Sequence, residues 1–177
     1  SDANEESLNE SLDYFIENLH YAKYIGAEMV GLETCRFSDD DEINNSEETY
    51  QYLLKNMKKL VSAAEEIGVN VGIEGVHFHV INTPTKMKRL VDDLNSPNVR
   101  VIFDPVNYIN TANYKNQDEI INTHFDLLGE KTKLLHLKDF KLVDGEVTYE
   151  FPCDGLLNKD LLWDKLKQYN PDIAVIL

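Results

Sequence analysis

Side chains that bind metals or transfer protons recur at similar places along the sequence. Glu33, Glu74 and Asp104 each close a short apolar run, and His136 lies within a fourth run of the same kind. Two carboxylates and an imidazole form a ligand set that suits Mg²⁺ or Mn²⁺ and that also accepts Co²⁺ or Zn²⁺. We therefore predict that Glu74, Asp104 and His136 bind one divalent metal ion (Mn, Mg, Co or Zn).

Each of these residues also has an ordinary structural explanation. A carboxylate after a strand often caps a loop or the next helix, and His136, between Leu135 and Leu137, has the surroundings of a buried, hydrogen-bonded histidine. The recurrence on successive apolar runs favours a shared site, because separate structural explanations would otherwise have to hold at all three positions.

Helix-period segments alternate with these apolar runs, which is the pattern of parallel βα units. The predicted strands cover 28–33, 69–74, 99–104, 133–139 and 172–177, and the predicted helices cover about 5–25, 45–67, 84–94, 116–128 and 158–168. Asn45, Thr83 and Asn116 are predicted helix caps, and the predicted helix stops are Gly26, Gly68 and Gly129. Asp144-Gly145 predicts a hairpin turn within an insertion at 140–152.

Two architectures are compatible with five buried parallel strands. An open doubly wound sheet often carries a glycine-rich phosphate turn, and the sequence has no G-x-G-x-x-G or P-loop. A (β/α)8 TIM barrel instead places catalytic groups at the carboxyl ends of several strands, which is the observed pattern. The length of 177 residues indicates a single domain, 1–177.

Composition limits the classes of partner. Seventeen Lys and Arg against 32 Asp and Glu give a formal net charge of -15, which repels a phosphate backbone, so nucleic acid is not an expected partner. The sequence contains no run of 18 apolar residues, so no membrane span is expected. Cys35 and Cys153 lie far apart and no secretory leader is visible, so a disulfide framework is not indicated and the reducing cytoplasm is the expected location.

The motifs "GIEGV", "VIFDPVNYI" and "LLHLKDF" resemble the sugar phosphate isomerase/epimerase family with the xylose isomerase-like barrel, grouped in the AP endonuclease family 2 superfamily. The segments "GLETCR", "HVINTP" and "CDGLLN" extend the resemblance over most of the chain. The resemblance implies a TIM barrel of which this chain supplies the C-terminal part, about strands 4 to 8.

The resemblance also implies roles for individual residues. Glu74 corresponds to a metal ligand that also serves as an acid/base, and Asp104 and His136 correspond to metal ligands. The fourth ligand of the family, a glutamate ending strand 8, would come just after Leu177, so the chain as given is expected to lack it. Asn107 stands where many sugar epimerases have a histidine; an amide can bind a sugar hydroxyl but carries no charge.

The activity implied is a metal-dependent isomerisation or epimerisation of a keto-sugar or sugar phosphate, by proton abstraction through an enediolate. Lys138 is predicted to be catalytic with Glu74, because an ammonium can stabilise the enolate. Asp139 is predicted to hold a loop. The predicted substrate-binding residues are Glu33, His77, His79, Asn107 and Lys138.

Two alternatives remain open. A metal-dependent dehydratase or lyase on the same barrel would use the same three ligands. The second alternative is a catalytically incomplete fragment. Five of eight strands leave two sheet edges unpaired, so such a chain is expected to form a homo-oligomer.

Overall fold

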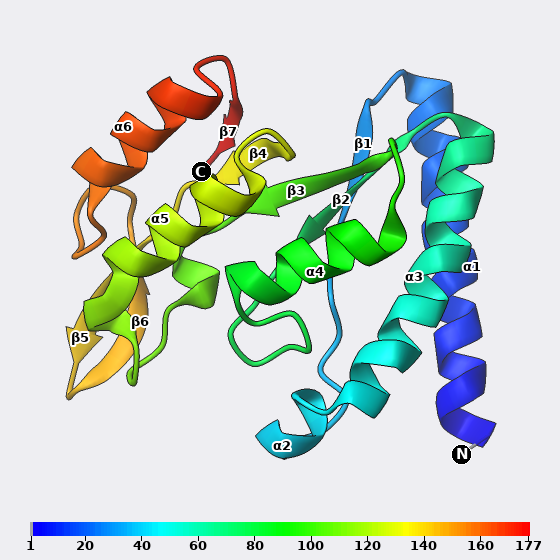
Figure 1. The fold of residues 1–177 in the computed structure, drawn as a ribbon, viewed down its shortest axis with the longest axis horizontal. Helices are drawn as coiled ribbons and strands as arrows, with labels where there is room; N and C mark the ends of the chain where they lie inside the picture. The colour runs from blue at the N-terminus through cyan, green and yellow to red at the C-terminus, as the bar shows by residue number, and fades with distance from the viewer. Residues whose placement is uncertain (1) are drawn as a thin grey trace.

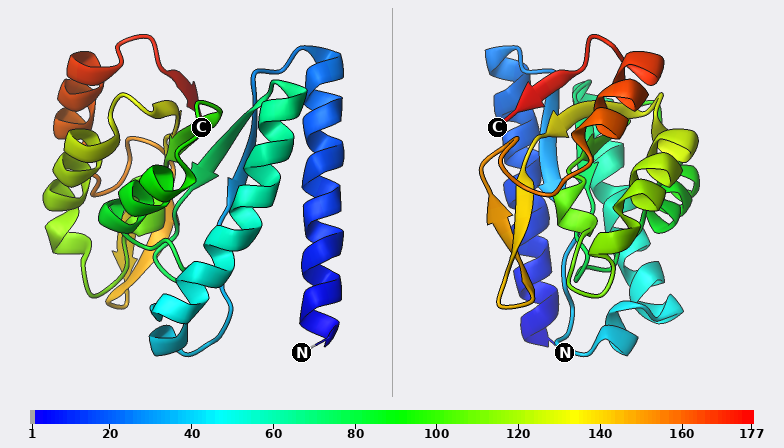
Figure 2. Two further views of the ribbon diagram at one scale, coloured as in Figure 1. Left: turned by 45° about the vertical axis from the view of Figure 1, so that its right-hand side comes forward. Right: turned by 90° about the vertical axis from the view of Figure 1, so that its left-hand side faces the viewer.

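The computed structural model describes residues 2–177, and their side chains from residue 9 onward. Its central sheet contains five parallel strands, in the order β1-β2-β3-β4-β7. Their bounds are β1 (Met29–Glu33), β2 (Asn70–Glu74), β3 (Val99–Phe103), β4 (Thr132–His136) and β7 (Ala174–Ile176). The strand order follows the chain order and never reverses, whereas a doubly wound sheet reverses at a switch point. The sheet is the curled part of a TIM barrel (Figures 1 and 2).

Five longer helices accompany the sheet: the first precedes β1, and the other four lie between successive strands of the sheet (Figure 1). They are α1 (Asp2–Ile25), α3 (Glu47–Ile67), α4 (Pro84–Leu94), α5 (Gln117–Leu128) and α6 (Lys159–Tyr169). Short turns of helix lie between them at α2 (Asp41–Asn44), η1 (Val106–Tyr108) and η2 (Tyr114–Asn116). No helix among residues 2–177 is both long and apolar enough to cross a membrane.

The helices pack against one face of the sheet. The register pairs Val71 with Val99 and Ile73 with Val101, so these four side chains point to the same face. They belong to a core cluster that includes helix residues such as Leu60 of α3. A second cluster joins β3 and β4 to α5 and α6 through residues such as Phe103, Leu135, Phe125 and Leu162. The opposite face of the sheet remains available for a site.

Several predicted helix ends are present. The Thr83 side chain accepts a hydrogen bond from the Lys86 N–H, and Pro84 is the first residue of α4. Gly26 and Gly68 follow α1 and α3 in the left-handed conformation, with φ of 76° and 78°.

One predicted cap is wrong, and a second lies at the predicted position without a side-chain cap hydrogen bond. Asn45 is the C-cap of α2, and α3 is capped one residue later by Ser46, whose hydroxyl accepts from the Thr49 N–H. The acidic loop therefore contains a helical turn that its polar composition did not reveal. Asn116 precedes α5 but makes no side-chain cap hydrogen bond, because the chain enters α5 directly from η2.

A hairpin leaves the sheet after β4. Its strands β5 (Asp139–Val143) and β6 (Glu146–Glu150) pair antiparallel. Asp144 and Gly145 both have positive φ, 52° and 87°, as a type I′ turn requires. The predicted strand 133–139 is too long at its end, because β4 stops at His136 and Asp139 already belongs to β5.

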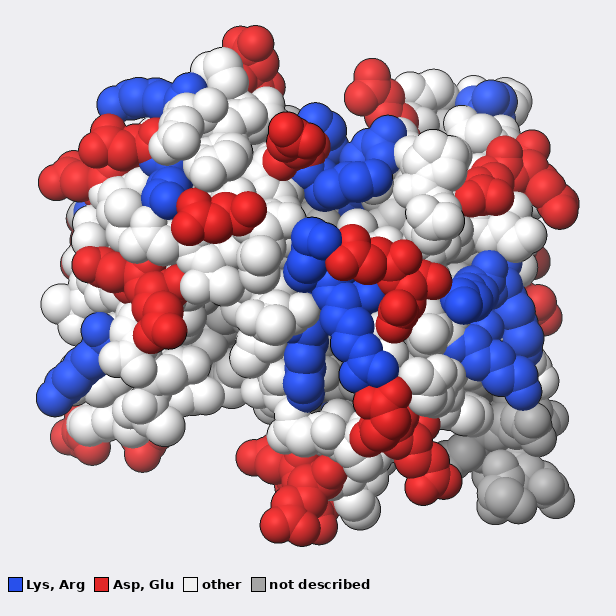
Figure 3. Space-filling model, in the orientation of Figure 1, with Lys and Arg blue, Asp and Glu red and all other residues white. Residues whose placement is uncertain are grey.

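The charged surface is largely paired around α4. Figure 3 shows basic side chains gathered in the middle of this face with acidic side chains beside them. Lys88 lies 2.7 Å from Asp92, and Arg89 lies 2.6 Å from Glu47 and 3.6 Å from Asp93. These basic residues therefore neutralise neighbouring carboxylates.

Candidate metal centre

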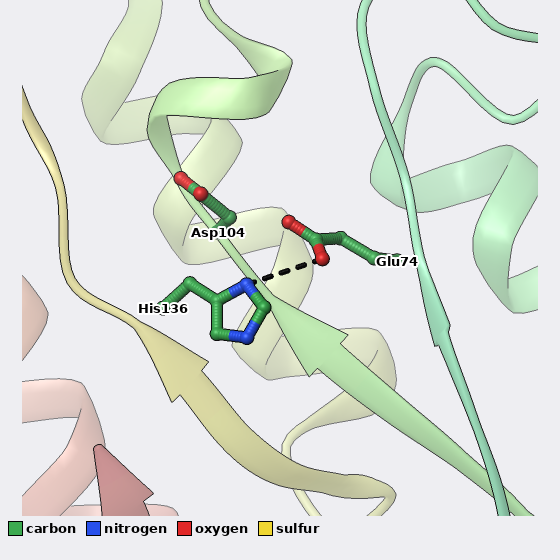
Figure 4. A group of neighbouring side chains, drawn as sticks. All are labelled: Glu74, Asp104 and His136. Carbon is green, nitrogen blue, oxygen red and sulfur yellow. Dashed lines mark ion pairs between the residues drawn. The ribbon is translucent and has the colours of Figure 1, made fainter. Parts of the chain in front are cut away.

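Three strand ends bring Glu74, Asp104 and His136 together (Figure 4). One potential ligand atom from each lies within 4.8 Å of the others. Glu74 ends β2, Asp104 directly follows β3, and His136 ends β4. The register pairs Glu74 with Ile102, two residues before Asp104, and Ile102 with Leu134, two residues before His136. Because side chains alternate along a strand, all three point to the face that the helices leave open.

Hydrogen bonds to one oxygen of each carboxylate orient it. Oδ1 of Asp104 accepts hydrogen bonds from the backbone N–H groups of Val106, at 3.0 Å, and Asn107, at 3.2 Å. Oε1 of Glu74 accepts from Nδ2 of Asn107 at 2.6 Å. The other oxygen of Glu74, Oε2, lies 3.1 Å from Nδ1 of His136. Such outer hydrogen bonds fix the orientation of metal ligands before an ion binds.

Burial makes the two negative charges costly. Glu74 is 5% exposed and Asp104 is fully buried. Desolvation raises the pKa of Glu74, and the nearby His136 opposes this effect. Desolvation also raises the pKa of Asp104, against the lowering effect of Lys138. A divalent cation would offset both charges, so the donor set fits such an ion in charge as well as in ligand type.

Lys138 and Asn107 contact the centre directly. The Lys138 ammonium lies 2.6 Å from Oδ2 of Asp104. It also donates to Oδ1 of Asn107 at 3.3 Å. The Asn107 amide therefore links Lys138 to Glu74.

The predicted substrate-binding residues Glu33, His77 and His79 lie less directly at the centre. Glu33 ends β1 in register with Glu74, so its exposed side chain points to the same face of the sheet. The backbone N–H of His77 donates to the Asn107 carbonyl at 2.7 Å, and its Nδ1 lies 3.2 Å from the same oxygen. Nδ1 of the His77 ring thus contacts the backbone of η1.

His79 is buried beside Glu33. It is 9% exposed, and its Nδ1 has no hydrogen-bond partner among the residues that the structure describes. Desolvation lowers the pKa of His79, and the charge of Glu33 opposes this. Burial thus favours the neutral form of His79, whose Nδ1 is the ring nitrogen left without a partner among these residues.

Asp139 holds a loop, as predicted. Its carboxylate accepts hydrogen bonds from the N–H groups of Phe140, Gly155 and Leu157, at 2.8 to 2.9 Å. Lys159 adds an ion pair at 3.1 Å. The segment 153–158 is thereby fixed to the base of the hairpin.

Tyr149 was missed from the sequence. Its hydroxyl donates to Oδ1 of Asn107 at 3.2 Å, and its ring centroid lies 5.4 Å from the Lys138 ammonium. The available signal was the alternation of Val147 and Tyr149 along β6, which places both on one face of the hairpin. That signal does not say which part of the protein this face meets.

A surface cavity lies away from the residues of this centre. A cavity of about 840 Å³ lies between α1, α3 and the loop after β1, with Arg36 and Tyr52 in its wall. No member of the Glu74, Asp104 and His136 group lines it. The group of Glu74, Asp104 and His136 is the stronger candidate site, because its ligand atoms converge and hydrogen bonds fix the two carboxylates.

The chain belongs to the xylose isomerase-like TIM barrel family, whose model matches residues 1–177. No curated protein matches it. Among solved structures, it is similar to a D-tagatose 3-epimerase-like protein (18% identity, TM-score 0.78), covering 97% of this chain and 63% of that one.

Two other solved structures show the same fold. The IOLI protein with a bound zinc atom has 20% identity and a TM-score of 0.74, covering 97% of this chain and 60% of that one. The probable 3-DHS dehydratase AsbF from Bacillus anthracis has 11% identity and a TM-score of 0.74, and the match covers 96% of this chain and 64% of that one. The chain thus spans about three fifths of the length of these three structures.

Proposed function

We propose that the chain carries the divalent metal site of an enzyme that isomerises or epimerises a keto-sugar or sugar phosphate. The observation that carries this proposal is the convergence of Glu74, Asp104 and His136, from three successive strand ends, within 4.8 Å. Membership of the xylose isomerase-like family supports it, as does the similarity to a D-tagatose 3-epimerase-like protein and to a zinc-binding structure.

Glu74, Asp104 and His136 would hold the ion. When bound, a divalent ion supplies Lewis acidity to a sugar carbonyl. Glu74 is the proposed base: its carboxylate removes the proton from the carbon beside the carbonyl, and the C–H electron pair moves toward the carbonyl oxygen. In an isomerisation, the protonated Glu74 then returns the proton to the former carbonyl carbon, which restores the Glu74 carboxylate. Lys138 donates a hydrogen bond to the oxygen on which negative charge develops.

The substrate hydroxyls or phosphate would be bound around this centre. Asn107 and Lys138 are the nearest candidates, since both already contact the ligand carboxylates. Glu33 and the unused nitrogen of His79 are candidates on the β1 side, and His77 contributes by holding η1.

A dehydratase is the second candidate function. The similarity to a probable 3-DHS dehydratase favours it, and the same ligands and base would serve, because loss of water also begins with proton removal beside a carbonyl.

The first test is calorimetric titration of the metal-free chain with Mn²⁺, Co²⁺ and Zn²⁺. We expect one ion per chain in the wild type and at least a hundredfold weaker binding in Glu74→Gln and Asp104→Asn. Glu66→Gln, on the exposed surface of α3, is the matched control. Wild-type binding that these two variants leave unchanged, or no binding at all, would overturn the proposed site.

The second test identifies the reaction. The metal-loaded chain is incubated in D₂O with ketohexoses and ketose phosphates, and NMR follows deuterium at the carbon beside the carbonyl. Deuterium incorporation with a rearranged sugar supports an isomerase or epimerase. Loss of water from the substrate indicates the dehydratase instead.

A further inference from the structure

Tyr149 of the β5–β6 hairpin contacts the residues around the candidate metal centre. The start of the hairpin is fixed, because Asp139 and Phe140 are fully buried. Its second strand lies along the loop after β3, where Thr111 donates to Glu146 at 2.7 Å and accepts from the Val147 N–H at 3.3 Å. Tyr149 lies between these two anchored regions.

The contacts of Tyr149 determine which way the Asn107 amide faces. Oδ1 of Asn107 accepts two hydrogen bonds, from the Tyr149 hydroxyl at 3.2 Å and from the Lys138 ammonium at 3.3 Å. An amide with two donors on its oxygen must present its NH₂ group on the other side. On that side Nδ2 of Asn107 donates to Oε1 of Glu74 at 2.6 Å.

The same contacts restrict Lys138. Its ammonium lies between Oδ2 of Asp104, at 2.6 Å, and the Tyr149 ring, whose centroid is 5.4 Å away. Cation–π attraction and the ion pair thus act on one group from two sides. Tyr149 therefore contacts Asn107, which holds Glu74, and Lys138, which pairs with Asp104.

We propose that Tyr149 is a positioning residue of this centre: it fixes the Asn107 amide, and through it the carboxylate of Glu74, in the orientation that receives the metal ion. The significance for metal binding rests on the proposed function, whereas the hydrogen-bond relay exists without a metal. Tyr149 is 59% exposed, so its removal from the site does not open the core.

The test separates the relay from the metal. The Asn107 side-chain NH₂ signals of the metal-free chain are assigned in a ¹⁵N NMR spectrum by their absence in Asn107→Ala. In the wild type, the proton donated to Glu74 should resonate downfield and exchange slowly with water. In Tyr149→Phe we expect this signal to move upfield and exchange faster, while Tyr24→Phe, a change at a largely exposed tyrosine of α1, leaves it in place.

An Asn107 signal that is the same in wild type and Tyr149→Phe overturns the inference, whatever the metal result. If the wild type binds Mn²⁺, Tyr149→Phe should weaken that binding by roughly tenfold, the lower end of the effect of outer hydrogen-bond partners. Unchanged affinity would overturn the inference as well. A wild type that binds no Mn²⁺ refutes the proposed function, and the NMR comparison alone then decides the role of Tyr149.

Discussion

The ammonium of Lys138 lies 2.6 Å from Oδ2 of Asp104, at the point where β3 and β4 end side by side. Asp104 is fully buried, whereas the Lys138 side chain is 41% exposed. The lysine therefore compensates, from the solvent side, a charge that the fold has removed from water. A divalent ion at the centre would share the same carboxylate.

Lys138→Met should destabilise the metal-free chain by about 1–2 kcal/mol at pH 7. The variant leaves the Asp104 charge without its partner, but water can reach the vacated position, which limits the loss. Urea unfolding in EDTA measures the change. Added Mn²⁺ should stabilise the variant more than the wild type.

The matched control for this change is Lys167→Met, which removes a partner of the exposed Asp164 at 3.5 Å. An exposed pair of this kind contributes little, so the control should stay within about 0.5 kcal/mol of the wild type. Equal effects of the two substitutions would contradict the assigned role of Lys138.

Glu74→Gln should stabilise the metal-free chain at high pH while removing metal binding. Burial raises the pKa of Glu74, so its contribution favours the folded state below the ordinary glutamate pKa and is lost as the pH rises through the raised value. Glutamine stays neutral throughout. In EDTA the variant should exceed the wild type by on the order of 1 kcal/mol at pH 8, and the difference should shrink toward pH 4.

This prediction is checked by urea unfolding across that pH range. A variant that is less stable than the wild type at pH 8 would show that the hydrogen bonds from Asn107 and His136 outweigh the desolvation of the charge.

We expect the free energy of unfolding to fall in mild acid because of His124. Its ring is fully buried, stacks on Phe103 with centroids 3.6 Å apart, and contacts Thr132 at 2.9 Å. Burial lowers the pKa of His124 to about 3. The neutral ring therefore contributes stability above the ordinary histidine pKa, and this stability is lost as the pH falls and the unfolded chain takes up the proton.

Replacing His124 with Phe removes this titration and keeps the stacking. Between about pH 6 and pH 4, the slope of unfolding free energy against pH should become shallower by up to roughly 1.4 kcal/mol per pH unit, the value for one proton. Urea unfolding at three pH values measures this slope for both proteins. Equal slopes of unfolding free energy against pH in the wild type and His124→Phe would rule out the assigned role of His124.

Gly75→Ala should displace the backbone next to Glu74, because the added Cβ would clash with Tyr108. A Cβ at this position would lie 2.2 Å from the Tyr108 hydroxyl oxygen and within 2.7 Å of two ring carbons. Tyr108 is 1% exposed and cannot move aside freely, so the backbone next to Glu74 must shift. We expect a loss of about 1–3 kcal/mol, typical of overpacking, together with weaker metal binding.

Thermal unfolding and Mn²⁺ titration measure both effects. Tyr108→Phe is the control, because it removes a buried hydroxyl that has no hydrogen-bond partner among the described residues, and it should be neutral or stabilising. A Gly75→Ala protein as stable as Tyr108→Phe would show that the clash relaxes without cost.

The order of helices and strands was predictable because it depends on local periodicity. The glycines at 26 and 68 and the Thr83-Pro84 pair act within a single turn, and the structure places helix ends there. The errors at Asn45 and at the end of β4 occur where tertiary contacts decide. The buried carboxylate of Asp139 draws the chain out of the sheet after His136, which a run of alternating residues cannot show.

The convergence of Glu74, Asp104 and His136 was predictable for a related reason. The carboxyl ends of adjacent parallel strands share one edge of a sheet, so a residue type repeated at those ends meets its counterparts. Tyr149 and the Asn107 carbonyl contact of His77 could not be found in this way. They depend on where the hairpin and the loop after β2 fold back, which is set by contacts more than 25 residues apart in the chain.

The strand order β1-β2-β3-β4-β7 also has a consequence for biosynthesis. Within the central sheet, every strand after β1 pairs with a strand that the ribosome has already completed. In the separate hairpin, β6 pairs with β5, which immediately precedes it. No strand of the sheet waits for a later segment to be inserted between it and its neighbour. The sheet can thus be extended in the direction of translation, and the three residues of the candidate centre are all in place on paired strand ends before α6 has been synthesised.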